Sequence, residues 1–324
     1  MLGLEIRRWR LLFRVAETIV SEEEAAPSAS AVAKLRSHPR VHWSEKDLGD
    51  RPRRRIVSLV PSLSEAIELL GMGDRLVGVT EYCVLPEGAF DGLPKLGGTK
   101  DADVEAIVAV SPDLVIANQE ENTARVVRKL AEHGIDVWVT YPRTVREGAE
   151  LLSELADLGA TAAARAQFVT PSLEAVEKAE RARAEFASGD RPRVFCAIWR
   201  DPWMTIGRDT YIHDMIELCG GQNLFADPAK GEASEAVSGR ADRRYPIVEL
   251  AGVVAAAPEV ILLPDEPYQF GADDAKELAA TDCPAARAGR IHLIDGTLVS
   301  WYGPRIAEAI QVLAAFFRLN ERAL

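Results

Sequence analysis

Large aromatic and charged side chains follow the predicted strands in the second half of the 324-residue chain. The apolar runs 194–198, 260–263 and 291–294 predict these strands, and the residues after them include Trp199, Arg200, Trp203, Glu266, Tyr268, Trp301 and Tyr302. Parallel strands end at one edge of a sheet, and open α/β sheets bind their ligands beyond that edge. Aromatic rings provide apolar surface with a polar tip, which suits a planar or macrocyclic ligand. The pattern predicts a ligand-binding site, and aromatic packing without a ligand is the alternative.

The first half of the chain places Tyr82 and Cys83 directly after another predicted strand, 75–80. We expect both residues to belong to the same ligand-binding set. Two arginines, Arg200 and Arg305, carry guanidinium groups that bind ligand carboxylates or amides, or that pair with interior acids instead.

The sequence lacks the patterns typical of catalysis, metal binding and nucleotide binding. Its five histidines form neither an HExxH motif nor a Ser-His-Asp order, and the glycines at 97–98 lack the frame of a phosphate-binding loop. We therefore expect no catalytic residue, no metal ligand and no catalytic cofactor. Two alternatives are His213 as a ligand to a metal centre, and an enzyme that acts on a bound cofactor through Cys83 or His213.

The composition is that of a folded protein, with 48% hydrophobic and 27% charged residues. A net charge of −12 disfavours a nucleic-acid partner, because phosphate binding needs clustered lysines and arginines. The four cysteines lie far apart and lack zinc-binding spacing: Cys83, Cys196, Cys219 and Cys283. We expect them to be reduced and free of disulfides, with Cys196 and Cys219 acting as small buried apolar residues.

The apolar stretch 11–20 is interrupted by Arg14, Glu17 and Thr18, so it does not resemble the core of a signal peptide. No run of residues is apolar for long enough to span a bilayer. The sequence as written therefore predicts a cytoplasmic protein. An extracytoplasmic, periplasmic location is the alternative if the start of the chain is misassigned.

Alternating strand and helix patterns predict an α/β fold with parallel sheets. We expect two Rossmann-like lobes joined by a long backbone α-helix, because the stretch 159–188 has helical character without strand signals. The predicted boundaries are an N-terminal appendage at 1–54, an N-terminal lobe at 55–158, the backbone helix at 159–188 and a C-terminal lobe at 189–324.

An internal sequence repeat supports two lobes of similar construction. The segment Ile67-Glu68-Leu69-Leu70-Gly71 recurs as Ile216-Glu217-Leu218-Cys219-Gly220. A second pair of segments, 104–117 and 252–263, shares an apolar helix, a proline, an acid and a strand in that order. Chance similarity between helix–strand units is the alternative explanation.

Six segments in this order resemble the cobalamin-binding receptors of ABC importers: RRIVSLVPSLSEAIELLG, GVTEYCVLPE, LGGTKDADVEAIVAVSPDLVIA, DPWMTIGRDTYIHDMIELCGGQNLF, YPIVEL and WYGPRIAEAI. These receptors belong to the helical-backbone, class III periplasmic-binding-protein superfamily, and the resemblance covers residues 55–320. It implies a non-catalytic protein that holds its ligand in a cleft between two lobes. Members of the superfamily bind cobalamin, ferric siderophores or haem, so cobalamin or a related corrinoid is the expected ligand, with a siderophore or haem as the alternatives.

The resemblance also implies roles for individual residues. Tyr82 and Tyr245 fall where cobalamin receptors place aromatics that stack on the ligand, whereas two tryptophans of the receptors' cage fall on Thr99 and Asn118. Glu105 matches one of two surface carboxylates that dock on transporter arginines, and the other falls on Ala251. An ABC transporter permease is therefore the expected protein partner, approached through Glu105, unless the protein handles its ligand in the cytoplasm.

Overall fold

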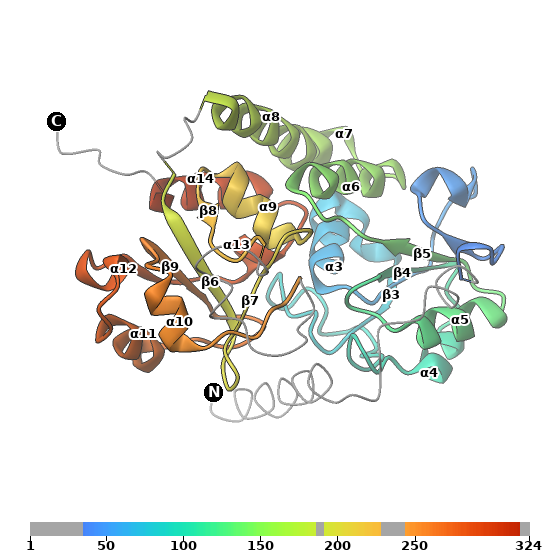
Figure 1. Cartoon of the computed structure of the whole chain (residues 1–324). Helices are drawn as coiled ribbons and strands as arrows, with labels where there is room; N and C mark the ends of the chain where they lie inside the picture. Colours follow the sequence, from blue (N-terminus) through green and yellow to red (C-terminus); the bar gives the residue numbers. More distant parts are fainter. Residues whose placement is uncertain (1–34, 186–190, 228–243, 318–324) are drawn as a thin grey trace. The chain divides into compact units, whose positions relative to one another are not determined.

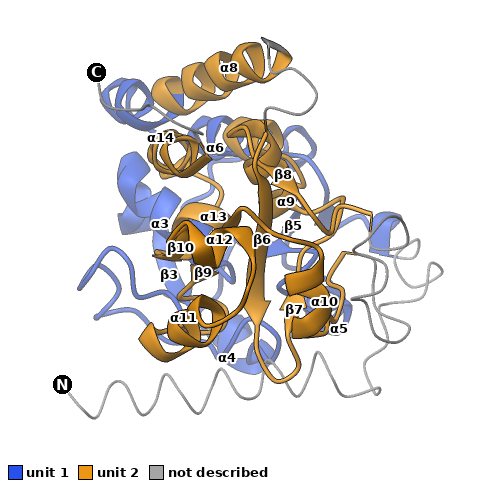
Figure 2. Cartoon of the chain, turned by 60° about the vertical axis from the view of Figure 1, so that its left-hand side comes forward, with its two compact units in different colours: residues 1–141, 151–169 blue, residues 142–150, 170–324 orange. Residues whose placement is uncertain are grey.

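The computed structural model describes residues 35–185, 191–227 and 244–317 (Figure 1). The chain divides into two compact units, coloured separately in Figure 2. Unit 1 comprises residues 1–141 and 151–169, and unit 2 comprises 142–150 and 170–324. Residues 1–34 of the predicted N-terminal appendage and residues 186–188 of the predicted backbone helix lie outside the described residues.

Unit 1 is built on a five-stranded parallel sheet in the order β1-β5-β4-β2-β3. Its strands are β1 (Val41–His42), β2 (Ile56–Ser58), β3 (Leu76–Val79), β4 (Leu114–Asn118) and β5 (Val137–Thr140). Its helices between strands are α3 (Pro61–Ile67), α4 (Val104–Ala109) and α5 (Ala124–Glu132). A strand followed by a helix and a parallel strand is the βαβ unit that the sequence pattern predicts.

The two faces of this sheet are covered by different helices. Side chains alternate along a strand, and Val57, Val115 and Val137 share one core cluster with Ile107 of α4 and Leu130 of α5. On the opposite face, the Ser64 hydroxyl of α3 lies 2.8 Å from the Ser58 hydroxyl of β2. Both faces are therefore buried, as parallel sheets require.

Residues 35–54 contribute to unit 1, whereas the sequence pattern predicts a folded lobe only from residue 55. Strand β1 pairs with β5, and the Arg53 side chain is 4% exposed. Its guanidinium donates to the Asp136 carboxylate at 2.8 Å, next to a second donor, Arg40, at 2.9 Å. The sequence does not predict the strand in this stretch, because its composition is mixed and a strand of two residues is too short to give a periodic pattern.

Unit 2 has a sheet in the order β10-β9-β6-β7, with β8 pairing with β6. The strands are β6 (Arg193–Trp199), β7 (Met204–Thr205), β8 (Gln222–Asn223), β9 (Val260–Pro264) and β10 (Ile291–Ile294). All pairs are parallel except β6 with β7, which are antiparallel. The helices are α9 (Tyr211–Leu218), α10 (Leu250–Ala255), α11 (Ala272–Ala279), α12 (Pro284–Arg287), α13 (Thr297–Ser300) and α14 (Ile306–Phe317).

Helices also cover both faces of the sheet of unit 2. Phe195 of β6 and Ile261 of β9 share a core cluster with Val253 of α10 and Leu278 of α11. On the other face, a Cβ added at Gly221 would lie 2.8 Å from both Val194 and Ile216 and 3.1 Å from Phe317. Helices α9 and α14 therefore pack closely on that face.

The connection between the units is helical. Helix α6 (Val145–Asp157) ends at a turn in which Gly159 has φ 134°, and a helical run then continues through α7 (Ala162–Ala164), a π-helical stretch (Arg165–Val169) and α8 (Thr170–Glu185). Pro171 follows the π-helical stretch and cannot donate a backbone hydrogen bond, which explains the irregular turn before it.

Candidate functional site

The carboxyl edge of the unit 2 sheet brings together residues from three strand ends. Trp199 ends β6 and is 8% exposed, and its ring meets the half-buried Tyr268 edge-on, with centroids 5.4 Å apart. Because β6 and β9 are parallel neighbours, the two rings converge although they lie far apart in the sequence. This is the edge that the strand pattern predicts as a ligand-binding site.

Trp203 and Arg200 have structural partners. Trp203 is 9% exposed and stacks on Phe270 in the core of unit 2, with centroids 5.8 Å apart. The guanidinium of Arg200 lies 5.3 Å from the Trp203 ring and donates to the carboxylates of Asp274 and Glu277. The pairing with Asp274 raises the pKa of Arg200. The interior salt bridge, expected as the alternative for Arg200, is therefore present.

Glu266 follows β9 and contacts residues at the end of helix α13, at the same edge. The Ser300 hydroxyl is 3.1 Å from its Oε1, and the Trp301 side chain also donates to its carboxyl group. Burial raises the pKa of Glu266 to about 7 and outweighs the opposing hydrogen bonds from Ser300 and Trp301, and the carboxylates of Asp265 and Asp295 raise it slightly further. Glu266 therefore changes charge near neutral pH.

The two aromatic residues after α13 differ in exposure. Trp301 is half-buried, and the guanidinium of Arg305 lies 5.8 Å from its ring. Tyr302 is 7% exposed and meets Tyr211 edge-on at 5.7 Å, so it packs against α9. Arg305 also approaches the Asp295 carboxylate at 4.0 Å.

Tyr245, which follows the undescribed residues 228–243, is half-buried. The guanidinium of Arg244 lies 5.4 Å from its ring. The next strand-like residue, Ile247, forms an isolated bridge with Met204 of β7, so Tyr245 is tied to the antiparallel corner of unit 2.

In unit 1, Tyr82 is half-buried after β3, and its ring packs on Gly98, where an added Cβ would lie 3.2 Å away. Burial, followed by the carboxylates of Asp101 and Glu81, raises the pKa of Tyr82. Its neighbour Cys83 is 1% exposed, and its Sγ lies 3.1 Å from the Ser64 hydroxyl and 3.2 Å from that of Thr80. The structure therefore encloses Cys83 rather than presenting it to a ligand.

Asn118 and Thr99, which replace the two expected tryptophans, shape a loop after β4. Asn118 is 3% exposed, and its side-chain oxygen accepts from the backbone N–H of Glu120 at 2.7 Å. The carbonyl of Thr99 accepts from the Asn122 side chain at 2.8 Å. These bonds fix the loop in place of the apolar surface that tryptophans would supply.

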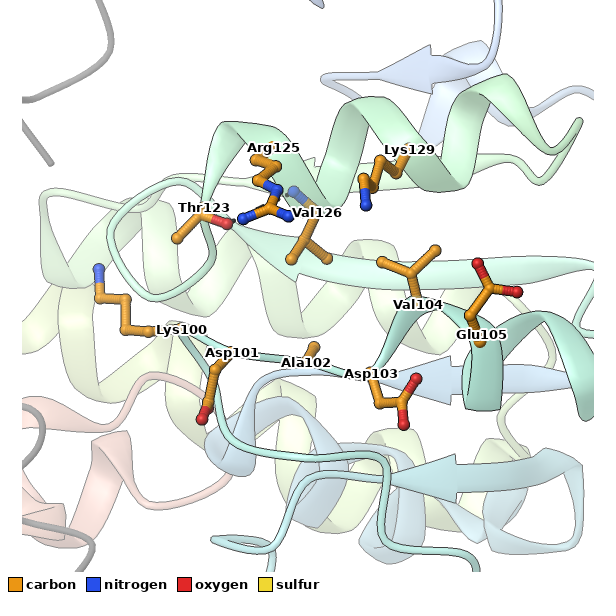
Figure 3. Close-up of a pocket in the computed structure, with 10 residues that line it drawn as sticks. All are labelled: Lys100, Asp101, Ala102, Asp103, Val104, Glu105, Thr123, Arg125, Val126 and Lys129. Carbon is orange, nitrogen blue, oxygen red and sulfur yellow. Dashed lines mark hydrogen bonds between the residues drawn. The ribbon is translucent and has the colours of Figure 1, made fainter.

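Glu105 lies on the exposed first turn of α4 and lines a pocket with residues of α5 (Figure 3). Figure 3 shows Arg125 and Lys129 on α5, across the pocket from Asp103 and Glu105. Glu105 is exposed, and within the described part of the chain its carboxylate forms no ion pair.

His213 is half-buried on α9, and burial lowers its pKa. Its Nδ1 lies 3.2 Å from the side-chain nitrogen of Asn223, which fixes the ring. Among the described residues, no three His, Cys, Asp or Glu side chains are grouped so as to hold a metal ion. The ring of His213 is thus positioned by its contact with Asn223.

Residues 56–297 match the family model described as periplasmic binding protein. The chain belongs to this family. Two relatives are both named vitamin B12-binding protein: that of Vibrio campbellii is 30% identical over 227 residues, covering 68% of this chain and 74% of the relative. That of Vibrio parahaemolyticus is 24% identical over 283 residues, covering 86% and 95%.

Two solved structures share the fold of this periplasmic binding protein. The periplasmic vitamin B12 binding protein BtuF of Vibrio cholerae superposes with a TM-score of 0.66 at 23% identity, covering 82% of this chain and 96% of its own. The periplasmic heme-binding protein RhuT from Roseiflexus sp. RS-1 gives 0.63 at 23% identity, covering 82% and 98%. The predicted two-lobed α/β class is confirmed.

Family membership corrects the predicted location. A cytoplasmic protein was the expectation from the N-terminal residues, and it is wrong, because the matched family is one of periplasmic, extracytoplasmic binding proteins. None of the described helices is both long and apolar enough to cross a membrane. All four cysteines are free and buried. Burial was predicted for Cys196 and Cys219, whereas Cys83 was expected to face a ligand.

Proposed function

We propose that this periplasmic binding protein binds cobalamin or a related corrinoid without catalysing a reaction, and passes it to an ABC-type importer. The relationship to the Vibrio campbellii vitamin B12-binding protein carries the proposal, because it reaches 30% identity over 74% of that protein. The family and the matched relatives are substrate-binding proteins, which favours binding over turnover.

Half-buried aromatic residues are the proposed ligand contacts. Tyr245, Tyr268 and Trp301 in unit 2 and Tyr82 in unit 1 keep part of their rings accessible. Aromatic faces of this kind stack on the flat, apolar surface of a macrocycle. Trp199, which is 8% exposed, meets the Tyr268 ring edge-on and holds it in place.

Three residues that the sequence predicts as ligand contacts pack against neighbouring side chains instead, and the proposal does not include them among the ligand contacts. Trp203 and Tyr302 are enclosed by aromatic neighbours, and Cys83 is enclosed by two hydroxyl groups. A thiol buried in this way has a raised pKa and is a poor nucleophile, which argues against an enzyme that uses Cys83.

The test is an absorbance titration of the purified chain with cyanocobalamin, dicyanocobinamide, haem and a ferric siderophore. We expect saturable spectral changes with the two corrinoids. Replacing Tyr268→Leu or Tyr245→Leu removes one stacking face and should weaken corrinoid binding by about five- to tenfold. Saturation with haem or the siderophore alone would assign the protein to the alternative ligand class.

Phe316→Leu is the matched control for these aromatic substitutions. Phe316 stacks on His292, with centroids 4.3 Å apart, at the end of α14 and beside strand β10. It lies outside the carboxyl edge of the sheet, so its loss should leave corrinoid affinity unchanged. Equal weakening in all three variants would indicate a general loss of stability in place of a local contact.

We further propose that Glu105 contacts the permease of the importer. Its exposed carboxylate lies across the pocket from Arg125 and Lys129, so the face offers charges of both signs. Glu105→Lys should reduce importer-dependent uptake of radiolabelled cyanocobalamin more than tenfold while solution binding stays intact. Glu308→Lys, on an exposed position of α14, is the control, and uptake that tolerates Glu105→Lys would reject this docking role.

A further inference from the structure

Glu266 lies where the proposed ligand meets unit 2. It follows β9 directly, Tyr268 is two residues later, and Trp301 donates to its carboxyl group. Gly296 permits this position, because a Cβ there would lie 2.4 Å from Cγ of Glu266 and 2.9 Å from its backbone nitrogen. A carboxyl group is therefore held in a fixed place beside Trp301, close in sequence to Tyr268.

The Ser300 hydroxyl can accommodate both the protonated and the ionised form of this carboxyl group without moving. Its oxygen lies 3.1 Å from Oε1 of Glu266 and 2.8 Å from the carbonyl oxygen of Gly296. A hydroxyl carries one proton, so it donates to one of these acceptors at a time. When Glu266 is protonated it donates to Ser300, which donates to Gly296, and every group is satisfied. When Glu266 is ionised, Ser300 donates to it instead.

The surrounding charges make the ionised state strongly negative. Asp265 lies beside Glu266 and accepts from the Gly296 N–H at 2.7 Å, and Asp295 lies at the end of β10. Arg305 lies 4.0 Å from Asp295, whereas Arg200 is paired with Asp274 and Glu277. Within the described part of the chain, the carboxyl groups of Glu266, Asp265 and Asp295 thus share this edge with the guanidinium of Arg305.

We propose that Glu266, with Asp265 and Asp295, selects a ligand whose periphery carries uncharged amides over one that carries carboxylates. This inference rests on the proposed function and specifies its ligand class. An amide N–H donates to a carboxylate, whereas a ligand carboxylate is repelled by it. Burial raises the pKa of Glu266 to about 7, so the discrimination should strengthen between pH 6 and pH 8.

The experiment uses a chemically matched ligand pair. Cyanocobalamin carries side-chain amides, and its monocarboxylate derivatives each have one amide hydrolysed to a carboxylate. We expect at least one isomer to bind about three- to tenfold more weakly than cyanocobalamin at pH 8, with a smaller difference at pH 6. Glu266→Gln should abolish this pH dependence, because the Gln amide can donate to Ser300 as the protonated acid does.

Glu308→Gln, the same substitution at an exposed site on α14, should retain the wild-type pH dependence. Equal discrimination at both pH values, unchanged in Glu266→Gln, would overturn the inference while the proposed function stands. Loss of cyanocobalamin binding itself at both pH values would instead reject the proposed function. The two failures are therefore distinguishable.

Discussion

At the scale of single residues, Cys83 shows how burial removes a reactive group from use. Its thiol lies against the hydroxyls of Ser64 and Thr80, and burial raises its pKa despite both contacts. Cys196 and Cys219 are buried in unit 2, and burial raises the pKa of each to about 12. Thiolate, the reactive form, is therefore scarce at all three positions at neutral pH.

The native protein should consequently be inert to thiol reagents. We expect Ellman's reagent to detect fewer than one thiol per chain in buffer at pH 8 and four in denaturant, because all four cysteines are buried and free. Cys83→Ser is the comparison: it should leave the native value unchanged and lower the denatured value by one. Rapid modification of a single thiol in the native wild type would contradict the burial of Cys83.

Sequence patterns predict the positions of single residues better than they predict the partners of those residues. They place Tyr268, Glu266 and Trp301 after strands of the unit 2 sheet, and Trp301 does contact the Glu266 carboxyl group. They do not predict the partners of Arg200, because Asp274 and Glu277 lie 74 and 77 residues away and are brought close only by folding. Ser300 was missed for the same reason, since an isolated serine carries no periodic signal.

At the scale of elements, the internal sequence repeat corresponds to equivalent helix ends and strands in the two units. Gly71 and Gly220 follow their helices with φ of 77° and 95°, and Ser111 and Ala257 precede their prolines with φ of 48° and 51°. Strands β2 and β6 each pair with two parallel neighbours in corresponding order. The repeated segments therefore encode the same helix ends and strand pairings, which explains why the elements were largely predictable.

Gly71 allows the energetic cost of a positive φ at this helix end to be measured. Its φ of 77° is unfavourable for other residues, and a Cβ there would meet nothing within 4 Å. Gly71→Ala should therefore lower the free energy of unfolding by about 1 kcal/mol through backbone strain alone. Gly92→Ala, where the space is also open and φ is not positive, is the control and should change stability little in urea denaturation.

The Asp136 cluster is a second element-scale feature, because it joins the segment before β2 to the start of β5. Burial alone would raise the pKa of Asp136, but hydrogen bonds from Arg40, Arg53 and His42 outweigh it and lower the pKa below its ordinary value of 3.8. The stabilisation is therefore present above the ordinary pKa and is lost as pH falls through the lowered one.

Removing this carboxylate leaves the buried Arg53 without its partner. Asp136→Asn should lower the free energy of unfolding by about 2–3 kcal/mol at pH 7, measured by urea denaturation, and the difference from wild type should shrink at acid pH. Asp157→Asn, which breaks an exposed pair with Arg165, is the control and should cost less than about 1 kcal/mol. Equal effects of the two substitutions would contradict the role of the cluster.

At the scale of the whole molecule, the location was the expectation that failed. Free, buried cysteines and an interrupted N-terminal apolar stretch favour a reducing compartment on average. Each thiol here is enclosed by different neighbours, Cys219 by Met215 and Ile310 and Cys283 near Thr281, so none is close to a second thiol. Such thiols persist in either compartment, and composition therefore carries little information about location.

Ligand binding should stabilise the whole chain by mass action. At a free cyanocobalamin concentration of about one hundred times Kd, the free energy of unfolding should rise by about 2.7 kcal/mol, and calorimetry should show a Tm that increases with ligand concentration. The free base 5,6-dimethylbenzimidazole, a fragment without the macrocycle, is the control and should leave Tm unchanged. A Tm that is insensitive to cyanocobalamin would contradict the proposed function.

The pairing of β1 with β5 sets an order in which unit 1 can be completed. Arg40, just before β1, is synthesised 96 residues ahead of its carboxylate partner Asp136. Strand β1 must therefore wait, unpaired, until most of the sheet that it joins has emerged, because non-local contacts form only after the intervening chain exists. Of the five strands in this sheet β1 is synthesised first, yet it can pair only after β5 has been made, and a chain cut between residues 43 and 55 would expose the edge of β5.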